Sequence, residues 1–171
     1  ANSIIDGTDA LLVTGETAVG DYPVEVISVL SKVIEQTEQS ISYNDKIIDN
    51  NKVVSIARAI SYAASTMAKD LDLKIIVTMT QSGGTARMVS SYRPSANIYA
   101  MTTMIETYRA LSIIWGVIPI LVDKYNSSDE IPELAKKKLQ DMDVILSDEK
   151  FIITGGVPVN IPGTTNYISV L

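Results

Sequence analysis

Residues 74–85, Lys-Ile-Ile-Val-Thr-Met-Thr-Gln-Ser-Gly-Gly-Thr, decide the fold of this chain. Residues 74–79 are rich in β-branched side chains, which predicts a short strand. Residues 80–85 then combine hydroxyl side chains with two glycines, which is typical of a turn, and a helix is predicted from there to about Tyr92. Because the residue before a proline disfavours helical backbone, Arg93-Pro94 ends this helix. The stretch is therefore a unit of strand, turn and helix.

The same alternation continues along most of the chain. Further strands are predicted at residues 97–101, 117–122, 151–154 and 167–171, and helices at residues 53–67, 105–114 and 128–140. This alternation predicts an α/β fold with three layers, in which an open, mostly parallel sheet of about five strands carries helices on both faces. Because no helix separates the last two strands, the last strand is expected to be an antiparallel edge.

A second informative stretch lies nearer the N-terminus. Residues 9–23 read Asp-Ala-Leu-Leu-Val-Thr-Gly-Glu-Thr-Ala-Val-Gly-Asp-Tyr-Pro. Residues 10–13 predict a buried strand, and a polar turn that carries Thr14 and Glu16 follows it. An amphipathic helix is predicted over residues 24–39, with Asp21 as its N-cap.

Residues 40–51 collect Ser, Asn and Asp around few apolar side chains, which is typical of a domain boundary. We therefore expect one part at residues 1–42 and a second, compact part at residues 43–171.

The composition excludes several kinds of site. The chain has 171 residues, 46% of them apolar, with no Cys and no His. It therefore has no Ser-His-Asp triad, no Cys nucleophile and no His-based proton shuttle, and no metal site is predicted. A net charge of −6 argues against a nucleic-acid partner. No membrane span is predicted, and a cysteine-free chain without a signal peptide predicts a cytoplasmic protein.

The turn at residues 80–85 is the first candidate site. Glycines let the backbone approach a ligand, the first N–H groups of a helix attract anions, and the hydroxyls add donors, so the turn suits a phosphate group. Arg87 and Arg93 flank the turn's helix and are candidates to assist the anion. In the alternative interpretation the turn is purely structural, with Ser82 or Thr85 capping the helix. The candidate phosphate-binding residues are Thr80, Gln81, Ser82, Gly83, Gly84 and Thr85.

The second candidate is the Gly- and Pro-rich segment at residues 155–166, between the last two predicted strands. It exceeds a tight hairpin loop in length and is therefore predicted to be a lid. The alternative is an edge-strand hairpin stiffened by proline and glycine. The candidate lid residues are Gly155, Gly156, Pro158, Pro162, Gly163 and Thr164.

Residues 9–23 closely resemble the last strand and following loop of the β/α barrel of pyruvate kinases, and the remaining alternation resembles the C-terminal regulatory domain of that family. The resemblance implies that residues 1–42 are a remnant of the barrel, with Thr14 and Glu16 at its mouth. The alternative for Glu16 is a structural role, as a cap or in an ion pair. The implied reaction is the last step of glycolysis, phosphoryl transfer from phosphoenolpyruvate to ADP, with Mg and K.

The family's catalytic and metal-binding residues belong to earlier barrel strands. The resemblance therefore implies that this chain carries no catalytic residue, no metal ligand and no cofactor, and that it is inactive by itself. It also implies a homotetramer with contacts in this domain.

The resemblance further implies an allosteric effector whose phosphate is held by residues 80–85 and covered by the segment at 155–166. Relatives that respond to fructose 1,6-bisphosphate often carry Lys where this chain has Gln81. Because Gln supplies no positive charge, a monophosphate effector is expected here, either a sugar phosphate or AMP. Two other functions remain open on the residues alone: a stand-alone sugar-phosphate or nucleotide-binding module, and a purely structural assembly domain.

Overall fold

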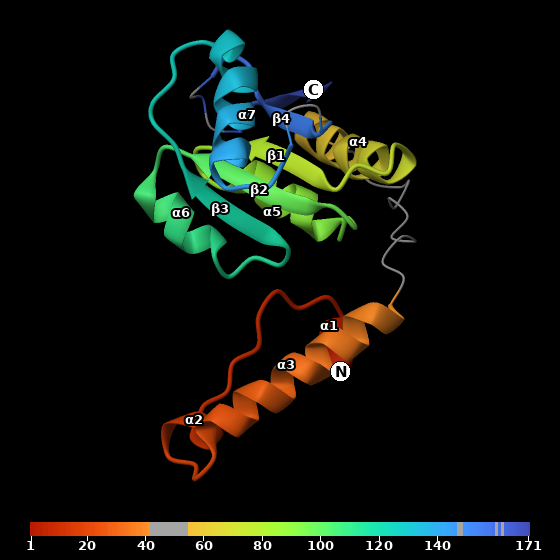
Figure 1. Ribbon diagram of the computed structural model, residues 1–171, viewed down its shortest axis with the longest axis vertical. Helices are drawn as coiled ribbons and strands as arrows, with labels where there is room; N and C mark the ends of the chain where they lie inside the picture. The colour runs from red at the N-terminus through yellow and green to blue at the C-terminus, as the bar shows by residue number, and fades with distance from the viewer. Residues whose placement is uncertain (42–54, 147–148, 160, 162) are drawn as a thin grey trace. The chain divides into compact units, whose positions relative to one another are not determined.

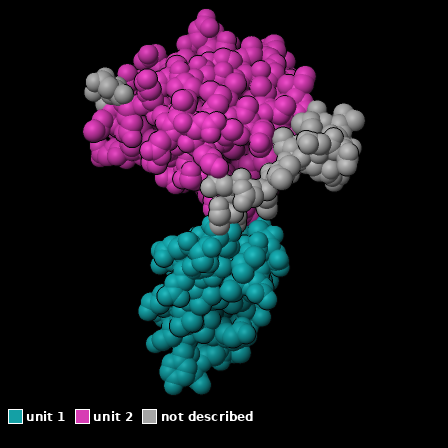
Figure 2. All heavy atoms as spheres, turned by 90° about the vertical axis from the view of Figure 1, so that its right-hand side faces the viewer, with its two compact units in different colours: residues 1–45 teal, residues 46–171 magenta. Residues whose placement is uncertain are grey.

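A computed structural model describes residues 1–41, 55–146, 149–159, 161 and 163–171 (Figure 1). The chain divides into two compact units, residues 1–45 and 46–171 (Figure 2). Most of the predicted boundary segment, residues 40–51, lies outside the described residues, so the division into residues 1–42 and 43–171 stays a prediction. No helix in the described ranges has both the length and the apolar character needed to cross a membrane.

The first unit is helical. It contains α1 (Asn2–Ile5), α2 (Gly15–Ala18) and α3 (Pro23–Ser40), and α3 confirms the helix predicted over residues 24–39. Pro23 occupies the first turn of α3, where a missing N–H costs no hydrogen bond. The N-cap of α3 is Tyr22 and not Asp21, and no side chain caps the helix.

The strand predicted at residues 10–13 is wrong. This segment has no regular structure, and the Leu12 side chain is 89% exposed. A strand needs a neighbour to bind its N–H and C=O groups, and the described part of the first unit offers only helices. The apolar run thus marks a segment able to form a strand, but pairing decides whether it does.

The second unit confirms the predicted α/β fold. Its elements are α4 (Ile56–Asp70), β1 (Ile75–Met79), α5 (Gly84–Ser91), β2 (Asn97–Thr102), α6 (Ile105–Leu111), β3 (Val117–Leu121), the 3₁₀-helix η2 (Ser128–Glu130), α7 (Ile131–Asp141), β4 (Ile152–Gly156) and β5 (Thr165–Val170). The sheet order is β3-β2-β1-β4-β5. All neighbours are parallel except β4 and β5, which are antiparallel, so β5 is the predicted edge strand.

Two hydrophobic cores, one on each face of the sheet, make the three layers (Figure 1). On one face, α7 packs Ile131, Ala135 and Leu139 against alternate residues of the strands. On the other face, α4, α5 and α6 pack against the remaining alternate residues, and small side chains such as Ala64 and Ala86 allow close approach. Successive side chains of a strand point to opposite faces of the sheet, so each continuous apolar run contributes side chains to both cores.

A proline lies in the edge strand β3. The Ile98 N–H donates to the Gly116 C=O over 3.1 Å, and the Val122 N–H donates to the Thr102 C=O over 2.9 Å. Because consecutive residues of a strand direct their polar groups to opposite sides, the nitrogen of Pro119 faces away from β2. Pro119 therefore removes no hydrogen bond from the sheet.

Candidate functional site

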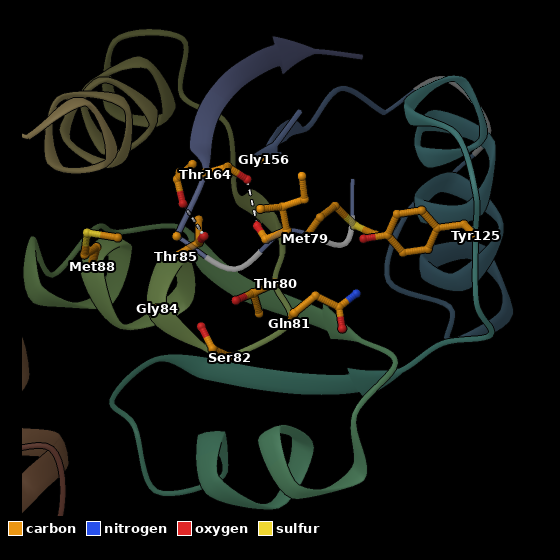
Figure 3. A pocket seen from close by; sticks show the side chains of 13 residues that line it. Met79, Thr80, Gln81, Ser82, Gly84, Thr85, Met88, Tyr125, Gly156 and Thr164 are labelled. Carbon is orange, nitrogen blue, oxygen red and sulfur yellow. Dashed lines mark hydrogen bonds between the residues drawn. The ribbon is translucent and has the colours of Figure 1, made fainter. Parts of the chain in front are cut away.

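The candidate site lies where the strand order reverses. From β1 the chain builds β2 and β3 on one side and then returns to β4 on the other side, so the carboxyl ends of β1 and β4 flank a topological switch point. Ligands of open α/β sheets bind at such points. A cavity of about 60 Å³ is found there (Figure 3), lined by Met79, Thr80, Gln81, Ser82, Gly84, Thr85, Met88, Tyr125, Gly156, Ile161, Gly163, Thr164 and Thr165.

Gly83 caps α5 and needs the conformation that glycine adopts easily. Its φ is +82°, in the left-handed region, and its N–H donates to the Thr80 hydroxyl over 2.9 Å. No side chain caps this helix, so the alternative in which Ser82 or Thr85 is the cap is wrong. Gly83 therefore acts as the cap and does not line the cavity, whereas Ser82 and Thr85 do.

The first turn of α5 presents backbone donors to the cavity. The first N–H that bonds back across the turn is that of Arg87, which donates to the Gly83 C=O over 3.0 Å. Within the described residues the N–H groups of Gly84, Thr85 and Ala86 have no acceptor. Such N–H groups carry the positive end of the helix dipole, which makes this end of α5 suited to an anion.

Gln81 is held in place by neighbours from other elements. The Thr103 hydroxyl donates to Gln81 Oε1 over 3.0 Å, and the Thr107 hydroxyl donates to the Gln81 C=O over 2.6 Å. Burial raises the pKa of the Tyr125 phenol, while its hydrogen bond with the Gln81 side chain opposes that rise. Tyr125 is thus a neutral phenol at neutral pH, and this wall of the cavity carries no charge.

The segment between β4 and β5 closes the cavity from the other side, but it is shorter than predicted. Gly155 and Gly156 belong to β4, and Thr165 begins β5, so the loop comprises residues 157–164. Its ends are joined by Asn166, which accepts from the Val157 N–H over 2.8 Å and donates to the Val157 C=O over 2.7 Å. The loop therefore leaves the sheet from a fixed base.

Only some of the predicted lid residues reach the cavity. Gly156, Gly163 and Thr164 line it. Gly155 does not line it, and a Cβ added there would lie 3.0 Å from the Met79 Cβ, so its small size serves strand packing. Pro158 is exposed and does not line the cavity, and Pro162 lies outside the described residues.

Five lining residues are not among those singled out from the sequence, although Ile161 and Thr165 lie within the candidate segment at residues 155–166. Tyr125 follows β3, which is parallel to β1, so Tyr125 lies at the same carboxyl end of the strands as the turn after β1. This position after a strand was the feature of the sequence that could have indicated Tyr125. Thr165 adjoins a predicted lid residue. Its hydroxyl lies 2.6 Å from that of Thr85, across 80 positions of sequence. The other three, Met79, Met88 and Ile161, give the cavity apolar surface.

The two arginines proposed as helpers do not line the cavity. The Arg93 guanidinium lies 4.6 Å from the centroid of the Trp115 ring, a cation–π contact, and Arg87 is exposed. None of the described residues that line the cavity is charged. Any anion bound there is therefore held by backbone N–H groups and by neutral side chains.

Thr14 and Glu16 belong to the first unit. Thr14 is the N-cap of α2 without a side-chain hydrogen bond, and its C=O accepts from the Thr17 hydroxyl over 3.2 Å. Glu16 lies exposed in the first turn of α2. In the described ranges it forms no ion pair and caps no helix, so its predicted structural role is not seen. A role for Thr14 and Glu16 at a barrel mouth stays a prediction.

Replacing Gly83 by Ala is expected to lower the free energy of unfolding by about 1–2 kcal/mol. An L-residue at φ +82° is strained, and the new Cβ would lie 3.1 Å from Leu111 Cδ2. Urea denaturation followed by circular dichroism measures the change. Gly83→Asn serves as the control, because Asn tolerates this backbone better and should lose less. An Ala variant as stable as the parent would contradict the assigned cap.

Comparisons with known proteins agree with this fold. The family model "Pyruvate kinase, alpha/beta domain" matches residues 58–171. Pyruvate kinase from Thermotoga maritima is 42% identical over all of this chain and 36% of its own length. The enzyme from Clostridium acetobutylicum is 37% identical over 99% of this chain and 36% of its own length. A crystal structure of a Cryptosporidium parvum pyruvate kinase covers 99% of this chain, with a TM-score of 0.83 at 30% identity, and this chain covers 34% of it.

The chain spans about a third of the length of these relatives, and the family model matches well over half of the chain. The protein therefore belongs to the pyruvate kinase family, and this chain corresponds to the C-terminal part of its members.

Proposed function

We propose that this chain is the regulatory and oligomerisation part of a pyruvate kinase, and that its cavity binds the phosphate group of an allosteric effector. The complete enzyme would transfer a phosphoryl group from phosphoenolpyruvate to ADP in the cytoplasm. A ligand regulates only if it binds two states with different affinity, so the effector would favour one arrangement of the subunits.

One observation carries the proposal for the cavity: donors from two distant segments converge on it at the N-terminus of a helix. Residues 82–85 contribute hydroxyls and the N–H groups of the first helical turn, and residues 163–165 contribute two threonines. Oxygen atoms of a phosphate accept hydrogen bonds from such donors, and the helix dipole favours the negative charge.

The lining also indicates the class of effector. A phosphate monoester brings one anionic group, which the end of α5 is suited to hold. A second phosphate placed against Gln81 and Tyr125 would face only neutral groups and would lose hydration without gaining a countercharge. We therefore propose a monophosphate, either a sugar phosphate or AMP.

The Mg and K of the parent enzyme are proposed to bind outside this chain, in the part of the family that it does not cover, as the resemblance implies. In the described ranges no three Asp, Glu, His or Cys side chains come together in a group that could hold a metal ion.

We expect the purified chain to produce no pyruvate from phosphoenolpyruvate and ADP in the presence of Mg and K. The resemblance implies that the family's phosphoryl-transfer and metal-binding residues lie in barrel strands that this chain does not cover, so no catalysed rate is expected. A coupled assay with lactate dehydrogenase measures the rate, with a full-length pyruvate kinase as the positive control. Turnover that survives repurification of the chain would contradict the assignment.

Ligand-induced stabilisation tests the effector site. Thermal unfolding is measured with ribose 5-phosphate, glucose 6-phosphate, AMP, fructose 1,6-bisphosphate and inorganic phosphate. A monophosphate at 100 times its dissociation constant should add about 2.7 kcal/mol of stability. The double variant Ser82→Ala, Thr85→Ala should lose this gain. Ser91→Ala, at the other end of the same helix, should keep it.

The outcomes separate the candidate functions. Stabilisation by a monophosphate that the double variant abolishes supports the effector site. The uncharged lining also favours a second candidate, a purely structural assembly domain. The absence of any shift with all five ligands would refute the effector site and would leave the structural assembly domain as the better description of this chain.

A further inference from the structure

The hydroxyl groups of Thr85 and Thr165 form a short hydrogen bond in the cavity wall. Their Oγ1 atoms lie 2.6 Å apart, and each residue is only 5% exposed. Thr85 lies in the first turn of α5, and Thr165 is the first residue of β5. The bond therefore joins the anion-binding end of the helix to the strand that follows the lid loop.

A count of protons shows that this pair has one donor to spare. Each hydroxyl carries one proton, and one of the two is used between the oxygens. Within the described residues neither hydroxyl has another hydrogen-bond partner. The second proton is therefore available, and both residues line the cavity.

The usual local acceptor for a helical threonine receives a different hydroxyl here and has no hydrogen bond with Thr85. Thr and Ser hydroxyls often donate to the C=O four residues earlier, as Ser61 does to Ala57 over 2.8 Å. For Thr85 that group is the Gln81 C=O, which accepts the Thr107 hydroxyl over 2.6 Å. The spare proton is thus left for a group that enters the cavity, because a buried hydroxyl without an acceptor is costly.

We propose that Thr165 is a positioning residue for this site: it donates to the Thr85 hydroxyl and so directs the Thr85 proton at a phosphate oxygen of the ligand. The inference rests on the proposed function. Two hydrogen bonds then follow one another, from Thr165 to Thr85 and from Thr85 to the phosphate. Each polarises the next, so the Thr85 hydroxyl is a better donor than it would be without Thr165. Ligand binding also holds the first residue of β5, which ties the lid loop to the occupied site.

The test compares affinities for inorganic phosphate and ribose 5-phosphate by isothermal titration of the whole chain. Thr165→Val keeps the shape but removes the hydroxyl, and it should weaken binding about five- to tenfold. Thr165→Ser restores the hydroxyl and should restore the affinity. The double variant Thr85→Val, Thr165→Val should bind no more weakly than Thr85→Val alone, because Thr165 acts through Thr85.

Thr154→Val is the matched control. Thr154 is also a buried threonine, and its hydroxyl donates to the Tyr167 C=O over 2.9 Å outside the cavity. It should lose comparable stability without losing affinity. If Thr165→Val binds as tightly as this control, or if the losses at Thr85 and Thr165 simply add, the positioning role is refuted while the effector site stands. If the parent chain binds neither these two probes nor glucose 6-phosphate, AMP or fructose 1,6-bisphosphate, the proposed function fails, and this inference fails with it.

Discussion

Replacing Phe151 by Ala should lower the free energy of unfolding by about 3–5 kcal/mol. Phe151 is 2% exposed and is the largest of the fully buried side chains among the described residues, and it lies in the core beneath α7. Its removal leaves a cavity that surrounding residues fill only in part. Because a folded domain is stable by only about 5–15 kcal/mol, this loss removes a large share of the total.

Urea denaturation followed by circular dichroism measures this effect as a lower transition midpoint with an unchanged slope. Leu146→Ala is the control, since Leu146 is 80% exposed and its truncation should change the free energy by no more than about 0.5 kcal/mol. If Phe151→Ala were no more destabilising than Leu146→Ala, the assigned core would be wrong.

Replacing Gly156 by Ala should reduce the affinity for inorganic phosphate by roughly 10- to 100-fold. A Cβ at this position would lie 2.3 Å from Thr164 Oγ1 and 3.0 Å from the Thr164 C=O oxygen. Because the second contact is with backbone, the end of the lid loop must shift, which strains or breaks the hydrogen bond between Thr85 and Thr165. Overpacking of this kind costs about 1–3 kcal/mol, and each 1.4 kcal/mol is tenfold in affinity.

Isothermal titration with inorganic phosphate measures the loss for Gly156→Ala. Gly15→Ala in the first unit is the control, since a Cβ there meets nothing within 4 Å and the affinity should not change. If Gly156→Ala bound inorganic phosphate as tightly as the parent chain and with the same stoichiometry, the end of the lid loop at Thr164 would take no part in holding the anion.

The fold was predictable because its signals are local. The apolar pattern within each strand of the second unit, and within its longer helices, predicts that element. The sheet of five strands follows from their alternation along the chain. Residues 10–13 failed for the opposite reason. Their apolar run is compatible with a strand, but pairing depends on a neighbour that the segment itself does not specify.

The site was predictable only in part, for a similar physical reason. Residues 80–85 predict an anion site because their glycines and hydroxyls are adjacent in the sequence, and the structure places most of them around one cavity. The contact between Thr85 and Thr165 joins positions 80 residues apart and has no local signature. The alternative interpretation places a hydroxyl at the cap of α5, since side-chain caps are common, whereas Gly83, with its left-handed backbone, is the N-cap.

The position of Pro119 sets how this sheet can meet another one. Strand addition requires a row of outward N–H donors, and at the β3 edge a ring nitrogen without hydrogen interrupts that row. At the opposite edge, β5 carries no proline in its ladder and has no further strand beyond it in the described sheet. The missing N–H at Pro119 therefore disfavours growth from both sides, which would build an open ribbon of many copies. If two such sheets paired through β5, each would use up its available edge, and the association would close at two copies.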